Sequence, residues 1–132
     1  MATKTVLDPI EVMSVKAVGG TKGAKGAFDL LESKLPSIRG RRFYGTYNPW
    51  TEEYRACVVK IQGDDASRIG LEEWTIPGGA YLTRKVDDWP SKIQQYPQFF
   101  DELASGQEVD RSRPSLEFYR SRRELVIYLP VK

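Results

Sequence analysis

Apolar positions in the first half of the chain recur at spacings that predict one strand, one helix and then two strands. Glu11 to Val18 is typical of a strand, and the glycines after it end the pattern before a helix expected over roughly Lys22 to Leu35. The apolar face of that helix follows the helical period through Ala24, Ala27, Phe28, Leu31 and Leu35. Two further strands, Arg42 to Tyr47 and Tyr54 to Ile61, flank a turn at Asn48-Pro49, which predicts an antiparallel hairpin. The predicted order is therefore βαββ.

The second half of the chain repeats this order. Strand-forming residues run from Glu72 to Val86 and are interrupted at Pro77-Gly78-Gly79, where we expect a kink or bulge at a sheet edge. A helical stretch follows and ends near Gly106, and Pro97 should divide it into a short first turn and a main helix. Its apolar face comprises Ile93, Tyr96, Phe99, Phe100 and Leu103. The chain then closes with a predicted hairpin whose strands are Ser115 to Arg120 and Glu124 to Val131.

Two βαββ units commonly join into one antiparallel sheet with both helices on one face, which predicts an α+β fold and one domain over residues 1–132. The two halves align Arg42-Phe43-Tyr44-Gly45-Thr46 with Ser115-Leu116-Glu117-Phe118-Tyr119. Because strand side chains alternate, this alignment predicts Phe43, Leu116 and Phe118 toward the helices. The side chains expected on the opposite, open face are Tyr44, Thr46, Glu117 and Tyr119. We expect that open face to form a ligand cleft.

Composition excludes several kinds of chemistry. The 132 residues are 40% hydrophobic and 29% charged, which is the balance of a globular domain. The absence of histidine excludes triads with an imidazole base and histidine metal sites, so we expect no metal and no cofactor. The net charge of +2 is too small for nucleic-acid binding by counterion release, and no stretch is long enough to cross a bilayer. We therefore expect a cytoplasmic protein, monomeric or dimeric, that binds neither nucleic acid nor a membrane directly.

Four stretches of the chain resemble, in their order and spacing, the gyrase-inhibitor-like superfamily, which includes the effector-binding domains of multidrug-responsive MerR-type and AraC-type activators. They are Arg41-Arg42-Phe43-Tyr44-Gly45, Ile76-Pro77-Gly78-Gly79-Ala80-Tyr81, Arg113-Pro114-Ser115-Leu116-Glu117-Phe118-Tyr119 and Val126-Ile127-Tyr128-Leu129-Pro130-Val131. The resemblance implies a stand-alone domain with a cleft on the sheet face away from the helices, where hydrophobic and often cationic compounds bind. No helix-turn-helix pattern accompanies these stretches, so direct control of transcription is not expected.

The resemblance also implies which residues line the cleft. Glu117 occupies the position of the buried glutamate of multidrug-binding members, Tyr44 that of the pocket tyrosine, and Trp89 that of an aromatic cover before the second helix. Tyr119 and Thr46 join them by strand alternation. Further aromatic candidates, whose faces the sequence does not settle, are Trp50, Trp74 and Tyr81. The competing interpretations are a solvated strand glutamate, cross-strand tyrosine pairs and tryptophans packed in the core.

Three functions fit this set of residues. In the first, a buried carboxylate at Glu117 attracts a lipophilic cation or aromatic compound, and the aromatic side chains stack on it. In the second, the chain is a hydrolase of strained electrophilic natural products, with Glu117 as general base and Tyr44 or Tyr119 as proton donor. In the third, it is a gyrase-inhibitor-like interaction module whose partner is a regulator or gyrase. The first is the leading hypothesis, and an enzyme is the less favoured one.

Overall fold

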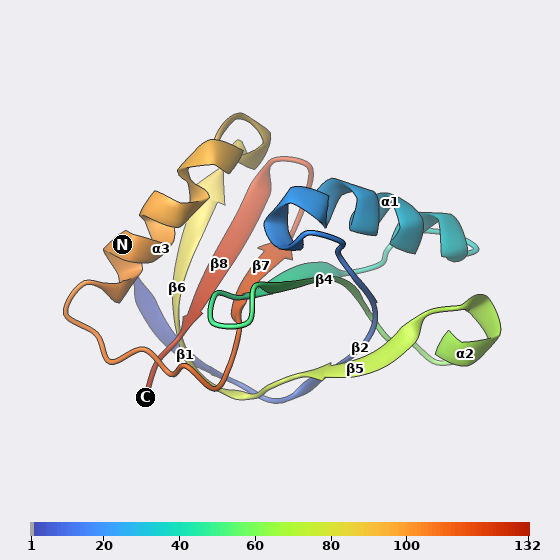
Figure 1. The fold of residues 1–132 in the computed structure, drawn as a ribbon, viewed down its shortest axis with the longest axis horizontal. Coiled ribbons are helices and arrows are strands. Elements are labelled where there is room, and N and C mark those ends of the chain that lie inside the picture. The colour runs from blue at the N-terminus through green and yellow to red at the C-terminus, as the bar shows by residue number, and fades with distance from the viewer. Residues whose placement is uncertain (1) are drawn as a thin grey trace.

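The computed structural model describes residues 2–132, which form one curled antiparallel sheet of eight strands with two main helices across one face (Figure 1). The strand order is β1-β6-β8-β7-β3-β4-β2-β5. The strands are β1 (Thr3–Leu7), β2 (Ile10–Lys16), β3 (Phe43–Asn48), β4 (Glu53–Val59), β5 (Glu72–Ile76), β6 (Gly79–Asp87), β7 (Ser115–Tyr119) and β8 (Glu124–Pro130). The helices are α1 (Ala24–Lys34), α2 (Ala66–Ile69) and α3 (Tyr96–Ala104), with short 3-10 turns at Gly20–Gly23, Trp89–Ser91 and Ile93–Gln95.

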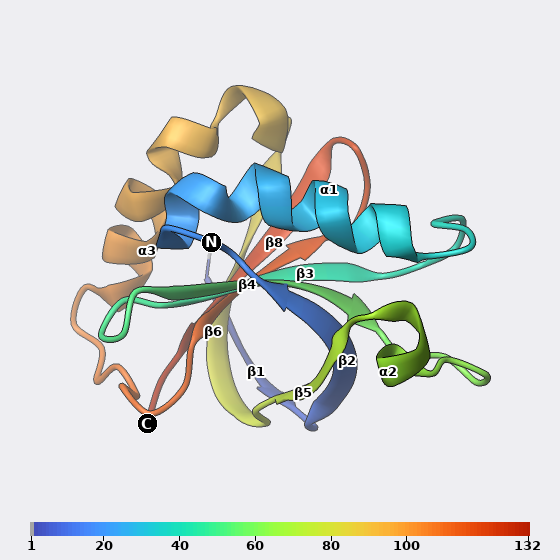
Figure 2. The same cartoon turned by 45° about the vertical axis from the view of Figure 1, so that its right-hand side comes forward.

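The predicted duplication is present, and the α+β fold class is confirmed. One half of the sheet has the order β5-β2-β4-β3 and the other β1-β6-β8-β7, and the halves meet where β3 pairs with β7. Phe43 packs in the core beneath α1, and its partner across the sheet, Tyr119, packs in the core beneath α3. Because directly paired residues share a face, both helices cover the same face of the sheet. Figure 2 shows the two helices lying side by side above it.

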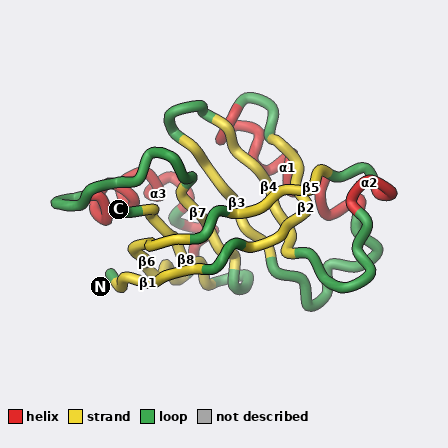
Figure 3. Tube along the Cα trace, turned by 90° about the horizontal axis from the view of Figure 1, so that it is seen from below, coloured by secondary structure: helices red, strands yellow, loops and turns green. Residues whose placement is uncertain are grey.

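The N-terminal strand β1 was not predicted, and it closes the sheet. The bends at Asp8-Pro9 and Pro77-Gly78 carry β1 into β2 and β5 into β6, and the pairing register is the same on both sides of the bends. Leu7 pairs with Gly79, and Ile10 pairs with Ile76. A single antiparallel ladder therefore crosses beneath the sheet, as seen from below in Figure 3. The predicted interruption at Pro77-Gly78-Gly79 is the place where the chain passes from one half of the sheet to the other.

The two bends lie so close together that Gly78 has no room for a side chain. A Cβ atom at Gly78 would lie 2.8 Å from the carbonyl oxygen of Leu7 and 2.8 Å from Pro9.

The ladder and the sheet above it enclose a third core cluster on the face away from the helices. Its buried members are Val12, Tyr44, Cys57, Ile76, Tyr81 and Leu116. That face was expected to be open, and most of it is packed.

Both helices bury the apolar stripe that the sequence predicts. Ala27, Leu31 and Leu35 of the α1 segment pack on β2 and β4, whereas Phe99 and Leu103 of α3 pack on β6 and β8. Pro97 falls in the first turn of α3, where its missing N–H removes no helical hydrogen bond, and the 3-10 turns before it form the divided start that was expected. No helix within residues 2–132 has the length and apolarity needed to cross a membrane.

Replacing Leu31 by alanine should test the packing of α1. Leu31 is fully buried, so Leu31→Ala leaves a cavity and should lower the free energy of unfolding by about 2–5 kcal/mol. The neighbouring Leu30 is 47% exposed, and Leu30→Ala should change it by less than about 0.5 kcal/mol. Urea unfolding monitored by circular dichroism measures both values. Equal effects of the two variants would contradict the helix orientation.

Candidate functional site

A pocket of about 780 Å³ opens on the helix-bearing side of the sheet, between the start of α1 and the length of α3. Its walls come from the turn before α1, the β3–β4 hairpin, α3 and the loop before β7. Its floor is β7, from which Ser115, Glu117 and Tyr119 line it. The aromatic and long apolar side chains that line it are Tyr47, Trp50, Tyr54, Ile93, Tyr96, Phe100 and Leu129. The pocket is therefore mainly apolar with one carboxylate in its floor.

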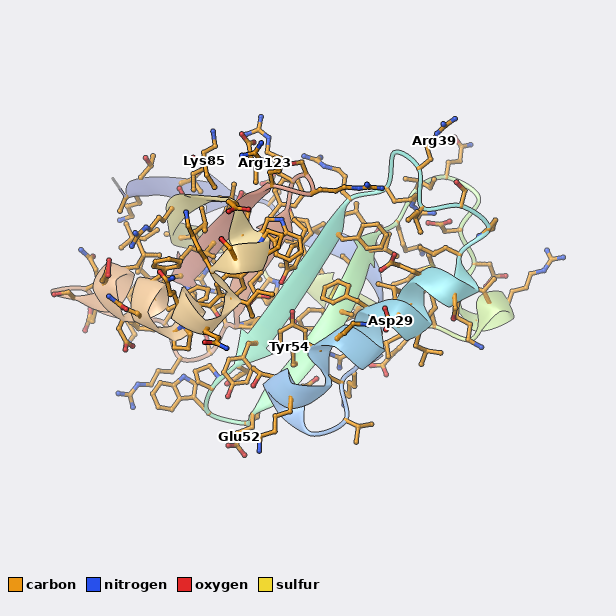
Figure 4. All side chains as sticks on the ribbon, turned by 90° about the horizontal axis from the view of Figure 1, so that it is seen from above. Asp29, Arg39, Glu52, Tyr54, Lys85 and Arg123 are labelled. Atoms are coloured by element: carbon orange, nitrogen blue, oxygen red, sulfur yellow. The ribbon has the colours of Figure 1, made fainter. Side chains whose placement is uncertain are left out.

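Glu117 is held in this floor by two tyrosines. The hydroxyl groups of Tyr54 and Tyr119 each donate a hydrogen bond of 2.8 Å to Oε1 of Glu117. The second oxygen, Oε2, accepts no hydrogen bond from any described residue, 2–132, and the side chain is only partly buried. Tyr54 belongs to β4, two strands away from Glu117, and is labelled in Figure 4 beside the start of α1. The arrangement leaves one carboxylate oxygen available to a molecule in the pocket.

A glycine makes this arrangement possible. Gly45 on β3 pairs directly with Glu117, and the Tyr54 hydroxyl lies over the space where a Gly45 side chain would be. A Cβ atom at this position would overlap the Tyr54 hydroxyl and would lie 2.7 Å from Oε1 of Glu117. Glycine inside a strand often marks a close approach of another group, and here that group is the tyrosine-carboxylate pair.

Burial sets the protonation behaviour of the site. Desolvation raises the pKa of Glu117 above its ordinary value of 4.5, while the hydrogen bonds from Tyr119 and Tyr54 oppose this shift. Burial and the nearby carboxylate also raise the pKa of Tyr54, Tyr96 and Tyr119, so all three phenols remain neutral donors at physiological pH. The Tyr96 hydroxyl is buried and has no hydrogen-bond partner among residues 2–132.

Aromatic contacts fix the position of Tyr119. Its ring lies between Phe28 of α1, at 5.5 Å, and Trp89, at 4.9 Å, both in edge-to-face geometry. Trp89 is itself held by a hydrogen bond of 2.9 Å from its indole nitrogen to the carbonyl of Ser121. Trp89 therefore supports the site from behind Tyr119 and is not part of the pocket lining.

Trp50 is the predicted aromatic residue that lines the mouth of the pocket. It lies in the β3–β4 turn and is 54% exposed, and the Arg111 guanidinium stacks over its ring at 4.3 Å. The side chains of Arg111, Lys22 and Asp101 also line the pocket and are exposed, in contrast to Glu117 in the floor.

The other predicted site residues lie on the opposite face of the sheet. Tyr44 and Thr46 do point away from the helices, as expected, but both are buried there and do not meet Glu117. The Tyr81 hydroxyl donates to the carbonyl of Pro77, and Trp74 stacks under the guanidinium of Arg55. Tyr44, Tyr81 and Trp74 pack in or against the third core cluster. Thr46 is a buried polar residue on the same face. The structure therefore does not bring them together with Glu117 and Tyr119.

The predicted faces of β7 were wrong, because the alignment of the two halves was out of register by one residue. Gly45, not Tyr44, is the counterpart of Glu117 in the two halves. Gly45 lies as far along the chain from the start of α1 at Ala24 as Glu117 lies from the start of α3 at Tyr96. A slip of one residue turns every side chain of a strand to the other face. Glu117 and Tyr119 therefore face the helices, while Leu116 and Phe118 face the third cluster.

Sequence reasoning missed two tyrosines of the site. Tyr54 shares a strand face with Ala56 and Val58, which pack beneath α1, and Tyr96 opens α3. The signal that could have found Tyr54 is Gly45, because a glycine in the middle of a predicted strand indicates that a side chain from a neighbouring strand crosses it. No comparable signal marks Tyr96, which the sequence assigns to the apolar face of its helix.

Comparison with known proteins gives a shared fold without a shared sequence. No known protein family and no curated protein matches the chain. Among solved structures, an integron cassette protein from the mobile metagenome of Vibrio cholerae has a TM-score of 0.73 at 15% identity, covering 99% of this chain and 95% of that one. SAV2435 bound to tetraphenylphosphonium has a TM-score of 0.66 at 13% identity, covering 100% and 94%. A bacterial transcription regulation protein from Staphylococcus aureus MU50 has a TM-score of 0.60 at 11% identity, covering 100% and 98%.

At these identities the likeness establishes the fold alone. The duplicated sheet with its two helices agrees with the fold that the resemblance to the gyrase-inhibitor-like superfamily implies. The cleft has a different position from the one expected, because the pocket that contains Glu117 lies between the two helices and not on the far face of the sheet.

Adding a methyl group at Gly45 should disrupt the site. Gly45→Ala forces the Tyr54 hydroxyl away from Glu117 and should lower the free energy of unfolding by about 1–3 kcal/mol. Gly26 in α1 has open space around it, so Gly26→Ala should stabilise the protein by about 0.5–1 kcal/mol through helix propensity. Urea unfolding of both variants gives the comparison, and a neutral Gly45→Ala would mean that Tyr54 does not occupy this position.

The raised pKa of Glu117 predicts a pH dependence of stability. A carboxyl group whose pKa is higher in the folded state than in the unfolded state contributes stability that is complete below about pH 4.5 and is lost as the pH rises through the folded-state pKa. The free energy of unfolding of the wild type, relative to Glu117→Gln, should therefore fall as the pH rises above 4.5. Urea unfolding of both proteins from about pH 4 to about pH 8 measures this difference. A difference that grows with pH would show that the pKa is lowered instead.

Proposed function

We propose that this chain is a small-molecule-binding domain that takes one lipophilic compound, cationic or aromatic, into the pocket between α1 and α3. The observation that carries the proposal is the carboxylate in the pocket floor. Tyr54 and Tyr119 occupy Oε1 of Glu117, and Oε2 has no partner within residues 2–132. A pocket of about 780 Å³ lies in the usual range for small-molecule sites, which are largely apolar with a few polar groups that fix orientation.

A cationic ligand suits the electrostatics of this floor. Removing a carboxylate from water is unfavourable, and the raised pKa of Glu117 expresses that cost. A bound cation replaces the lost hydration with its own charge, and nearby aromatic rings such as Tyr119 and Phe100 each add about 0.5–2 kcal/mol of cation–π attraction. Aromatic burial then supplies affinity, while Glu117 supplies the preference for charge.

The two tyrosines orient the carboxylate for this role. Their hydrogen bonds hold Oε1 over Gly45, which leaves Oε2 as the oxygen that meets a ligand. Ionised Glu117 attracts a cation and protonated Glu117 does not. Because the pKa of Glu117 is raised, affinity for a cation should increase as the pH rises through that pKa.

The shared fold supports this proposal. SAV2435, which has the same fold, is bound to tetraphenylphosphonium, a lipophilic cation. The four sequence stretches that resemble the gyrase-inhibitor-like superfamily point to the same class of ligand. The partner under this proposal is the small molecule itself, and a regulator or gyrase that reads the bound state is a further partner consistent with the superfamily.

A second candidate function is hydrolysis of strained electrophilic compounds. The raised pKa of Glu117 suits a general base, and two structures of the same fold, both from Listeria innocua, are described as hydrolases, with TM-scores of 0.54 and 0.53. The phenol protons of Tyr54 and Tyr119 point at the carboxylate, so the proton donor to a substrate oxygen would be Tyr96, whose hydroxyl has no partner among residues 2–132. Turnover of styrene oxide to its diol, abolished in Glu117→Gln, would favour the hydrolase.

Titration with tetraphenylphosphonium tests the binding proposal. The fluorescence of Trp50, which lines the pocket, should change saturably, and Glu117→Gln should weaken binding by about tenfold or more because the charge pairing is lost. The neutral analogue triphenylphosphine oxide should bind the wild type and Glu117→Gln equally.

Glu108→Gln is the matched control for the loss of one negative charge. Glu108 is exposed and does not line the pocket, so its replacement should leave the affinity unchanged. Absence of any saturable binding to the wild type would overturn the proposal. Equal affinity of the wild type and Glu117→Gln for the cation would remove Glu117 from the recognition of charge.

A further inference from the structure

A second hollow lies on the other side of the sheet, where the third core cluster reaches the surface. Two adjoining cavities, of about 820 Å³ and about 390 Å³, share Arg42, Phe118 and Tyr128 in their lining. The larger extends to the bend between β1 and β2, and the smaller extends past Val126 to Arg120 at the end of β7. We name this surface the Arg42 hollow, after the residue between the two cavities. None of these three shared residues lines the pocket of Glu117, and Tyr119 is the residue that borders both that pocket and the smaller cavity.

Aromatic side chains form the floor of the Arg42 hollow. The rings of Tyr44 and Phe118 are stacked, with centroids 4.8 Å apart and planes inclined by 23°. The Arg42 guanidinium lies 5.2 Å from the centre of the Phe118 ring. Tyr44 therefore covers one face of the Phe118 ring. Phe118 and Tyr128 are only partly buried, so the exposed parts of both rings present apolar surface to a ligand.

Several of the hydrogen-bond donors around this floor have no partner among residues 2–132. Within residues 2–132 the hydroxyls of Tyr44 and Tyr128 make no hydrogen bond, and Arg42 forms no ion pair. Arg120 makes only a long contact of 3.8 Å with Glu124, and both arginines are exposed. The third arginine here, Arg41, is already engaged by Asp64 at 2.7 Å.

The electrostatics of the two tyrosines agree with this placement. Burial raises the pKa of Tyr44 to about 12 and also raises that of Tyr128. The positive charge of Arg42 opposes both increases without cancelling them. Both hydroxyls therefore remain protonated donors and lie within reach of the Arg42 charge. The smaller cavity is lined by three arginines and by no carboxylate, whereas the acidic residues Asp8 and Glu11 line only the far end of the larger one.

We propose that the Arg42 hollow is a second ligand site, specific for planar aromatic anions. The ring of such a ligand would pack against the exposed parts of Phe118 and Tyr128, and its carboxylate, sulfonate or phosphate would accept hydrogen bonds from Arg42 and Arg120. Charge-assisted hydrogen bonds to a guanidinium are among the strongest polar contacts available at a protein surface. The Arg42 hollow thus offers hydrogen-bond donors, whereas the floor of the helix-side pocket offers a hydrogen-bond acceptor, Oε2 of Glu117.

Isothermal titration calorimetry with naphthalene-2-sulfonate tests this proposal on the full chain. The wild type should bind one equivalent saturably. Arg42→Gln and Arg120→Gln should each weaken binding by about tenfold, and Tyr128→Phe, which keeps the ring and loses the hydroxyl, by about threefold. The affinity for the sulfonate should fall as salt is added, and naphthalene-2-methanol, which lacks the charge, should bind equally to the wild type and to Arg42→Gln.

Arg39→Gln is the matched control for the arginine variants. Arg39 is exposed in the same loop and lines neither cavity, and Figure 4 shows it at the edge of the molecule. This variant should bind the sulfonate as the wild type does. Equal weakening by Arg39→Gln would show attraction by net charge alone and would overturn the site.

A second control separates the two sites. Glu117→Gln and saturating tetraphenylphosphonium should leave sulfonate binding unchanged, because the two sites lie on opposite faces of the sheet. Loss of binding in either experiment would place the sulfonate in the helix-side pocket and overturn the proposal. Absence of saturable binding to the wild type would overturn it as well. Thermal unfolding of each variant verifies that these surface substitutions leave the fold intact.

Discussion

The carboxylate of Glu117 is held by two phenolic hydrogen bonds at the junction of β3 and β7, where the two halves of the sheet meet. One phenol comes from β7 itself and the other from β4, so the interaction ties both halves together through a single oxygen atom. The absence of a side chain at Gly45 is the constraint on which this depends. A partly desolvated carboxylate with one unoccupied oxygen is unfavourable in an empty pocket, and that cost is what a cationic ligand would relieve.

The way the sheet closes decides which of its faces carries the pocket. Because β1–β2 and β5–β6 form one ladder beneath the sheet, the far face is largely filled by Tyr81, Leu116 and their neighbours. The helices do not cover the near face completely, since each packs on the two middle strands of its own half and leaves β3 and β7 less covered. The uncovered strip between α1 and α3 lies above β7 and contains Glu117. What remains of the far face is the Arg42 hollow at the edge of the third cluster.

The pocket of Glu117 and the Arg42 hollow differ in charge because side chains alternate along β7. Along β7, Glu117 and Tyr119 face the helices while Leu116 and Phe118 face away, so adjacent residues of one strand serve opposite surfaces. The near surface offers a hydrogen-bond acceptor in an aromatic setting, and the far surface offers arginine and tyrosine donors above an aromatic floor. A lipophilic cation and an aromatic anion would thus bind on opposite faces of the sheet, and they would not compete for one pocket.

The sequence by itself determined the repeated order of the main elements, since hydrophobic periodicity and turn residues act locally and survive small errors in the element boundaries. It singled out Glu117 only as a candidate, through the resemblance of four stretches to a known superfamily. The strand β1 was missed because Thr3–Leu7 buries little of itself and exists through its pairing with β6. Only the tertiary structure decided which face Glu117 occupies. Strand faces alternate with every residue, so an alignment slip of one position between Tyr44 and Gly45 reversed them, and nothing local fixes that register. Tyr54, which donates to Glu117, and Tyr96, which lines the pocket, likewise reach the site from other elements. Their positions depend on how β4 and α3 lie relative to β7, which local pattern does not encode.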